Sequence, residues 1–90
     1  MKTVRKRIRF FGDVQGVGFR YRAEHAARLY GVSGFVQNEW DGSVLMEIQG
    51  TEEAIDCVLM AIERGRYIRI TSMQVKTLPL VSEIGFQITG

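Results

Sequence analysis

Residues 15–20, Gln-Gly-Val-Gly-Phe-Arg, place two glycines and an arginine between an expected strand and an expected helix. The first N–H groups of a helix have no partner within the helix, and the helix dipole is positive there. Gly16 and Gly18 are free to turn successive N–H groups toward an anion. Arg20 adds a planar fork of donors that fits phosphate oxygens. The segment predicts an anion-binding cradle, and a plain strand-to-helix turn with a surface arginine is the alternative.

Two familiar nucleotide-binding loops do not match this segment. A P-loop requires Gly-Lys-Ser or Gly-Lys-Thr after its glycines, and neither follows here. A dinucleotide-binding turn would carry a third glycine where Tyr21 stands. These two nucleotide-binding motifs are therefore excluded.

The other side chains that could do chemistry have simpler interpretations. His25 is the only histidine and lies on the expected polar side of a helix, which favours a surface position. No His, Cys or carboxylate group has the spacing of metal ligands, so no metal site is expected. Cys57 is interpreted as a small packed side chain. Trp40, in an expected turn, either packs against the edge of the core or contacts part of a substrate, and packing is favoured.

The elements that must position these residues follow from hydrophobic periodicity. Apolar residues alternate with arginines over residues 4–12, which is typical of a half-buried strand. Apolar residues recur at helical spacing over residues 19–30 and again from the expected cap Thr51 to about Arg64. Asp-Gly at 41–42 favours a tight hairpin. Further strands are expected at 32–38, 43–49, 67–77 and 84–89.

This order, β-α-β-β-α-β with a short final strand, is typical of the ferredoxin-like, split β-α-β arrangement. We therefore expect an α+β sandwich, with an antiparallel sheet of four to five strands and two helices on one face. A length of 90 residues predicts a single domain, residues 1–90, and a monomer is the default expectation. Many unrelated activities share this fold, so function has to be argued from the site.

Charge is unevenly distributed along the chain. Residues 1–22 carry seven basic residues and one acidic residue, a net charge of +6, whereas the remainder carries −4. Such a field attracts anions, either a phosphorylated metabolite or a nucleic-acid backbone. A solvated strand face with a role in solubility is the alternative.

The expected location is the cytoplasm. A single cysteine cannot form an internal disulfide, which suits a reducing compartment. The basic N-terminus is not followed by an apolar run, so it does not read as a secretory signal. No stretch approaches the roughly 18 apolar residues that a membrane span needs.

Two longer motifs give the sequence a family resemblance. Residues 12–20 fit the pattern Gly-x-Val-Gln-Gly-Val-x-Phe-Arg, and residues 34–44 fit Gly-x-Val-x-Asn-x-x-Asp-Gly-x-Val. Together they resemble the two signatures of the acylphosphatase family. Their functional positions, Arg20 and Asn38, are eighteen residues apart. Residues 86–88 also resemble the closing strand of the family.

The resemblance implies an enzyme that hydrolyses the carboxyl-phosphate bond of a small acyl phosphate, releasing a carboxylate and inorganic phosphate, without a metal or another cofactor. Arg20 would hold the phosphate, and Asn38 would position the attacking water. Inorganic phosphate would also be an inhibitor. The implied phosphate-binding residues are Gln15, Gly16, Val17, Gly18, Phe19 and Arg20.

The sequence departs from the usual family pattern at three positions. Phe35 stands where tryptophan is frequent, Arg66 stands where proline is common, and Asp13 places a carboxylate beside the anion site. None of these is Arg20 or Asn38.

The hydrolysis of acyl phosphates does not require the dedicated general acid that the sequence lacks. Their leaving group is a carboxylate, whose conjugate acid has a pKa of about 4, so it needs no general acid. Phosphoryl transfer depends mainly on positioning and on stabilisation of charge on the oxygens. The resemblance further implies that the substrate's own phosphate accepts the proton of the water.

Two other functions have to be weighed. RNA-recognition domains share this topology, but they need exposed aromatic residues on their central strands. The open side of residues 43–49 offers only Leu45, Glu47 and Gln49. The chain could also be a module of a larger carbamoyl-transfer maturation protein, although its ends suit a stand-alone domain.

Overall fold

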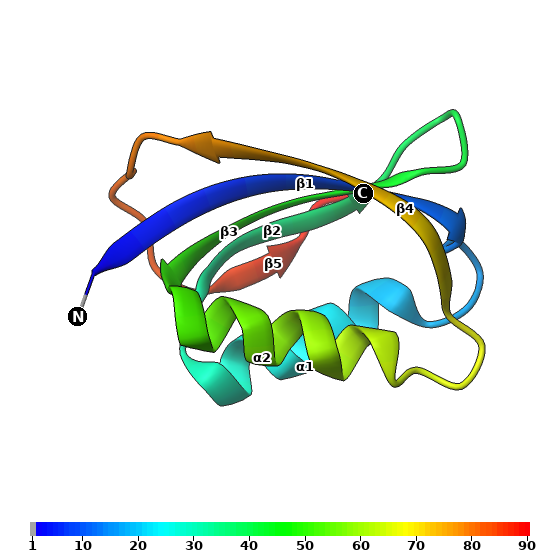
Figure 1. Ribbon diagram of the computed structural model, residues 1–90, viewed down its shortest axis with the longest axis horizontal. Coiled ribbons are helices and arrows are strands. Elements are labelled where there is room, and N and C mark those ends of the chain that lie inside the picture. Colours follow the sequence, from blue (N-terminus) through cyan, green and yellow to red (C-terminus); the bar gives the residue numbers. More distant parts are fainter. Residues whose placement is uncertain (1) are drawn as a thin grey trace.

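Five strands and two helices follow one another in the computed structural model, which describes residues 2–90. Figure 1 shows the strands as one layer with both helices on the same side of it. The elements are β1 (Thr3–Asp13), α1 (Phe19–Tyr30), β2 (Ser33–Asn38), β3 (Val44–Thr51), α2 (Glu52–Glu63), β4 (Arg69–Leu78) and β5 (Phe86–Ile88). The predicted ferredoxin-like α+β fold is confirmed.

The strands lie in the order β4-β1-β3-β2-β5. Every neighbouring pair is antiparallel except β2 and β5, which are parallel. The expected antiparallel sheet is therefore mixed at one edge. The reason is that the chain reverses direction after β4 and crosses to the far edge, where it runs alongside β2.

Element boundaries differ from the sequence expectation by one or two residues. β4 begins at Arg69 rather than at residue 67, because the preceding residues form a tight turn in which the N–H of Ile68 donates to the carbonyl of Gly65 at 3.1 Å. β1 continues through Asp13, which pairs with Arg69 on β4. This extension sets the point from which the β1–α1 loop departs.

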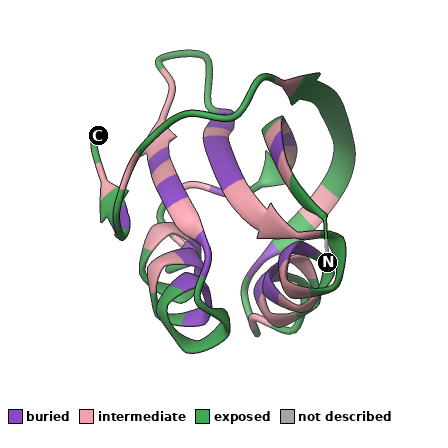
Figure 2. Ribbon diagram, turned by 90° about the vertical axis from the view of Figure 1, so that its left-hand side faces the viewer, coloured by how far each residue is buried: buried purple, intermediate pink, exposed green. Residues whose placement is uncertain are grey.

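The core lies between the sheet and the helices, as the buried residues in Figure 2 show. Ile8 and Phe10 project from β1 toward the helices, and the expected apolar stripes of α1 and α2 face them. Burying one such side chain contributes roughly 1.5–3 kcal/mol. The buried helical residues are Phe19, Ala23, Ala26 and Ala27 on α1, and Ile55, Val58 and Ile62 on α2.

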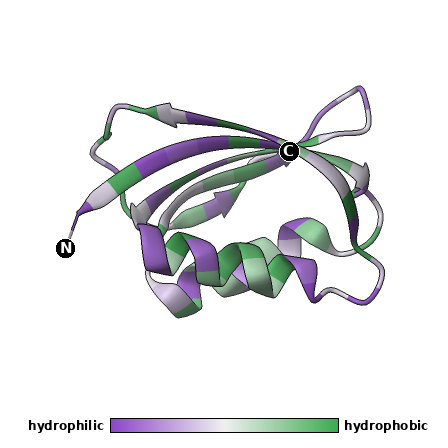
Figure 3. Ribbon diagram, viewed as in Figure 1, coloured by the Kyte–Doolittle hydropathy of each residue, from purple (hydrophilic) through white to green (hydrophobic). Residues whose placement is uncertain are grey.

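β1 is hydrophilic over long stretches (Figure 3). Its arginines are not simply solvated. Arg5 is only 3% exposed and donates to Glu47 at 2.9 and 3.0 Å, and Arg7 donates to the other oxygen of Glu47 at 2.9 Å. Burial by itself would raise the pKa of Glu47, but the hydrogen bonds from Arg7 and Arg5 hold that pKa below its usual value.

The same cluster fastens the segment between β4 and β5 to the sheet. Arg5 Nη1 donates to Glu83 Oε1 at 2.6 Å. The side-chain amide of Gln49 on β3 exchanges two hydrogen bonds with the backbone of Val81, at 2.9 and 3.0 Å. These contacts direct the chain into β5. Within residues 2–90, neither helix is long and apolar enough to cross a membrane.

Candidate active site

The β1–α1 loop lines a recess at the start of α1. Gly16 and Gly18 have φ angles of 72° and 81°, a conformation that other residues rarely adopt. Gly18 is the N-cap residue of α1, and no side chain among residues 2–90 caps this helix end. A pocket of about 160 Å³ lies here and includes Arg20 and Tyr21 in its lining. The first N–H groups of α1 are therefore left for an external acceptor.

Packing and hydrogen bonds hold this loop in place. Phe19 is buried, and its ring meets that of Phe10 edge to face, with centroids 4.8 Å apart. The side chain of Gln15 donates through Nε2 to the carbonyl oxygens of Glu39 and Ser43, at 2.7 and 2.9 Å. The loop is thus tied to the β2–β3 hairpin. The Gln15 side chain is used for this tie, which leaves only its backbone for an anion.

Arg20 and Asn38 donate hydrogen bonds to the same acceptor. Arg20 Nη1 donates to the carbonyl oxygen of Gly90 at 2.5 Å, and the backbone N–H of Asn38 donates to the same oxygen at 3.1 Å. Arg20 lies in the first turn of α1, and Asn38 is the last residue of β2. Figure 1 shows β2 and β5 ending on the side of the molecule that carries the β1–α1 loop. The two residues singled out by the motifs therefore lie beside each other.

The side chain of Asn38 has an unused acceptor. Among residues 2–90, its Oδ1 is the one buried side-chain oxygen or nitrogen without a hydrogen-bond partner. Leaving a buried polar group unpaired costs roughly 1–3 kcal/mol, so such atoms are rare and call for an explanation. A water or a ligand at this position would satisfy Oδ1.

The comparisons with known proteins agree with this geometry. The family model for acylphosphatase matches residues 6–88, which include both motifs. The chain belongs to the acylphosphatase family. The expectation that it is an acylphosphatase, and hence a hydrolase, is confirmed.

Individual acylphosphatases resemble it along most of their length. The acylphosphatase of Oceanobacillus iheyensis is 44% identical over 75 residues, which span 81% of this chain and 82% of the relative. The crystal structure of the Bacillus subtilis acylphosphatase superposes with a TM-score of 0.89 at 31% identity, covering 97% of this chain and 99% of that one. The structure of full-length HypF matches with a TM-score of 0.85 at 27% identity, over 99% of this chain but 12% of HypF. This acylphosphatase domain is therefore also similar to a small part of a much larger protein.

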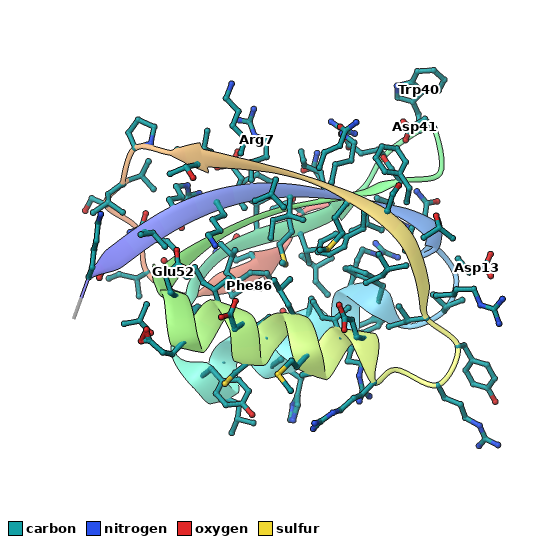
Figure 4. The ribbon with its side chains drawn as sticks, viewed as in Figure 1. Arg7, Asp13, Trp40, Asp41, Glu52 and Phe86 are labelled. Carbon is teal, nitrogen blue, oxygen red and sulfur yellow. The ribbon has the colours of Figure 1, made fainter. Side chains whose placement is uncertain are left out.

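The hairpin beyond Asn38 overturns one expectation. Trp40 was expected to pack, yet it is 99% exposed, and it projects from the tip of the hairpin away from the helices (Figure 4). The reason is the tight turn: Asp41 Oδ1 accepts from the N–H of Ser43 at 3.0 Å and from its hydroxyl at 2.6 Å. The hydrogen bond from the Ser43 hydroxyl is the main cause that lowers the pKa of Asp41.

Of the remaining residues that could do chemistry, His25 and Cys57 lie outside both acylphosphatase motifs, and Asp13 lies within the first. His25 is exposed on α1, and Cys57 is half-buried in α2. Asp13 is exposed at the end of β1, next to the loop (Figure 4). Throughout residues 2–90, no group of three or more His, Cys, Asp or Glu side chains could hold a metal ion.

Sequence reasoning missed the residues around Gly90. Thr89 Oγ1 donates to the side chain of Gln37 at 2.8 Å, and the N–H of Thr89 donates to the carbonyl of Val36 at 3.0 Å. These bonds continue the pairing of β5 with β2 as far as Gly90. No local signal marks them, because they depend on which edge of the sheet β5 joins.

Proposed function

We propose that Arg20 and the backbone of residues 15–20 bind the phosphoryl group of an acyl phosphate, while Asn38 positions the attacking water. The observation that carries this assignment is the shared acceptor at Gly90, which brings Arg20 and Asn38 together next to an uncapped helix N-terminus. The N–H groups of Gly16 to Phe19 and the Arg20 guanidinium would then surround the phosphoryl oxygens. In this arrangement residues 1–90 act as one acylphosphatase-like domain.

The reaction transfers the phosphoryl group from a carboxylate to water. The water oxygen forms a bond to phosphorus, and the bond between phosphorus and the carboxyl oxygen breaks, with the electron pair leaving on the carboxylate. That leaving group needs no proton, because its conjugate acid has a pKa of about 4. The water's proton passes to a non-bridging phosphoryl oxygen. The products are a carboxylate and inorganic phosphate.

Positioned charge supplies most of the catalysis in this scheme. In a loose phosphoryl transition state, negative charge spreads over the oxygens being transferred. In the proposed scheme the guanidinium of Arg20 and the N–H groups of the loop would surround those oxygens, and because Gln15 and Phe19 hold the loop in place, little reorganisation would accompany the reaction. Arg20 binds the same oxygens in the ground state and in the transition state.

Asn38 suits the water-positioning role because a carboxamide both accepts and donates. Its buried Oδ1 would accept a hydrogen from the water, which would satisfy the atom that now lacks a partner. Its Nδ2 would donate to a phosphoryl oxygen. The water would thereby be held in line with the bond that breaks.

Neither a metal nor another cofactor has a part in this mechanism. We expect full activity after exhaustive chelation with EDTA, because every group invoked is supplied by the chain itself. Inorganic phosphate should inhibit competitively, since it occupies the same cradle. Loss of activity with EDTA that magnesium or zinc restores would contradict the scheme.

We do not expect a nucleic-acid partner. The arginines of β1 that suggested one are paired with Glu47, Glu83 and Glu39 on the open face of the sheet. Their charge is therefore largely balanced locally, and a phosphate backbone would have to displace those carboxylates. A filter-binding assay with single-stranded RNA over a salt series tests this expectation.

We also expect the protein to be a soluble cytoplasmic monomer.

The central experiment is a hydrolysis assay with benzoyl phosphate, using a phosphomonoester as the control substrate. We expect rapid release of phosphate from the acyl phosphate and little from the ester, because the ester's poor leaving group needs a general acid. Turnover of the ester without turnover of the acyl phosphate would overturn the proposal.

A further inference from the structure

We propose that Glu39 is a positioning residue, which holds the phosphate-binding loop and Arg20 in a fixed arrangement relative to each other. Glu39 follows Asn38 at the start of the β2–β3 hairpin, at a position that neither family motif specifies. The inference rests on the proposed function, because it assigns a role in the arrangement of that same site. Two separate chains of hydrogen bonds start from Glu39.

The first chain leads from the backbone of Glu39 to the phosphate-binding loop. Its carbonyl oxygen accepts from Gln15 Nε2 at 2.7 Å and from the N–H of Gly42 at 3.2 Å, while its own N–H donates to the carbonyl of Ser43 at 2.9 Å. The closed end of the hairpin therefore fixes the acceptor for Gln15. Any shift of Glu39 would move the loop that Gln15 anchors.

The second chain leads from the Glu39 carboxylate to Arg20. Gln37 Nε2 donates to Glu39 Oε2 at 3.1 Å, and Gln37 Oε1 accepts from the hydroxyl of Thr89 at 2.8 Å. The carboxylate accepts only, so it selects the orientation of the Gln37 amide in which Oε1 faces Thr89. The next residue is Gly90, whose carbonyl accepts from Arg20 at 2.5 Å.

Arg9 completes the arrangement by neutralising the carboxylate. Arg9 Nη1 donates to Glu39 Oε1 at 3.3 Å and to the hydroxyl of Ser43 at 3.2 Å. The Glu39 side chain is 21% exposed, so this charge is partly screened from water. A negative group next to an anion site would otherwise weaken substrate binding. Paired with Arg9, Glu39 supports the site without repelling the phosphate.

This arrangement predicts a specific kinetic signature. Glu39 touches neither the bound phosphoryl group nor the water in the proposed scheme, so its removal should loosen the alignment of groups that remain present. Misalignment lowers turnover more than it lowers ground-state binding. Removal of the carboxylate also leaves Arg9 uncompensated, which favours anions. Phosphate affinity should therefore be kept or improved while kcat falls.

The test compares Glu39→Ala with Glu24→Ala. Glu24 is a matched control, since it is 25% exposed and pairs with Arg28 at 3.4 Å, within α1. With benzoyl phosphate, we expect Glu39→Ala to lower kcat about tenfold and leave the inhibition constant of inorganic phosphate unchanged or lower. Glu39→Gln, which keeps one acceptor oxygen, should recover part of kcat. Glu24→Ala should change neither quantity.

A double-mutant cycle tests the path through Thr89. Thr89→Val removes the hydroxyl that joins Gln37 to the segment carrying Gly90. If the path is correct, Glu39→Ala combined with Thr89→Val should lower kcat little more than the stronger single change. Fully additive losses would show that the two residues act independently, which would overturn the proposal.

A nuclear magnetic resonance measurement separates this inference from the proposed function. In ¹⁵N-labelled protein, Glu39→Ala should shift the side-chain resonance of Arg20 and the backbone amide resonance of Gly90, whereas Glu24→Ala should leave the Gly90 resonance in place. Unchanged resonances would overturn the positioning role even in an active enzyme. Shifted resonances in a protein that does not hydrolyse acyl phosphates would reject the proposed function alone.

Discussion

The two helices begin in opposite ways. At the start of α2, Thr51 Oγ1 accepts from the N–H of Ala54 at 3.1 Å, and Glu52 and Glu53 occupy the first turn. At the start of α1, Gly18 offers no side chain, and the first turn carries Arg20 in place of an acid. One N-terminal N–H of α2 is thus satisfied by a side-chain cap, whereas the N-terminus of α1 has no side-chain cap.

This difference separates stability from function within one small domain. A side-chain cap is worth about 1 kcal/mol, and an acid in the first turn adds a few tenths more. The chain forgoes both at α1 and instead ties the preceding loop to the β2–β3 hairpin through Gln15. Rigidity at this end comes from neighbouring elements, which leaves the helix terminus itself open to a ligand.

The largest effect should follow from removing the cation at the open terminus. We expect Arg20→Ala to lower kcat/KM for benzoyl phosphate on the order of a thousandfold, because the guanidinium stabilises charge on the transferred oxygens. Inorganic phosphate should also lose most of its inhibition. Steady-state kinetics with a phosphate inhibition series measures both quantities.

Arg20→Lys distinguishes charge from geometry in the same assay. A lysine restores the charge but cannot donate in a bidentate fork, so little activity should return. If Arg20→Ala still binds phosphate as tightly as the unaltered protein, the open terminus of α1 is not the cradle, and the comparison between the helices loses its functional meaning.

Asn38→Ala should have the next largest effect. We expect kcat to fall about a hundredfold while phosphate inhibition stays within a few-fold, because the carboxamide aligns the water and the phosphate rests on Arg20 and the loop. Asn38→Asp should be equally inactive, since it adds a negative charge beside an anion. A variant that loses about 1 kcal/mol of stability but keeps its kcat would mean that Asn38 only starts the hairpin turn.

A smaller effect should follow when α1 is made to resemble α2. Tyr21 is the third residue of α1 and is 73% exposed, so it tolerates substitution. Tyr21→Glu places an acid in the first turn, which should stabilise the helix slightly but raise the phosphate inhibition constant a few-fold. Tyr21→Gln provides the uncharged control. Equal phosphate binding in the two variants would show that charge at this terminus does not influence the anion.

The sequence predicts most of this molecule where the signal is local. Alternation in β1, the apolar stripes of both helices and the two motifs place Arg20 and Asn38 on the correct elements. Arg5 shows where this local signal is insufficient. The alternation in β1 predicts that its side chain is solvated, yet the side chain is buried. It can be buried because Glu47 on β3 and Glu83, in the segment after β4, pair with it.

The contacts that could not be predicted depend on the pairing of strands that are distant in the sequence. The shared acceptor at Gly90 exists because β5 pairs in parallel with β2, a choice of sheet edge that no local pattern encodes. The chain from Glu39 through Gln37 to Thr89 depends on the same pairing. The prediction that Trp40 packs is wrong for a different reason. The size of its side chain favours burial, but the tight turn stabilised by Asp41 directs it outward.

The smallest effect on activity should follow from changing the cap at the start of α2. Thr51→Ala removes the side-chain oxygen that accepts from Ala54, leaving an N–H at the start of α2 without its partner. We expect a loss of about 1 kcal/mol in the free energy of unfolding, measured by urea denaturation. Thr51→Ser, which keeps the hydroxyl, should retain most of that stability. Neither variant should change kcat or phosphate inhibition, because α2 begins at the opposite end of the helix layer from the β1–α1 loop (Figure 1). A change in phosphate inhibition with Thr51→Ala would mean that the two termini are coupled through the packing of α1 against α2, so that the cap of one helix also maintains the open end of the other.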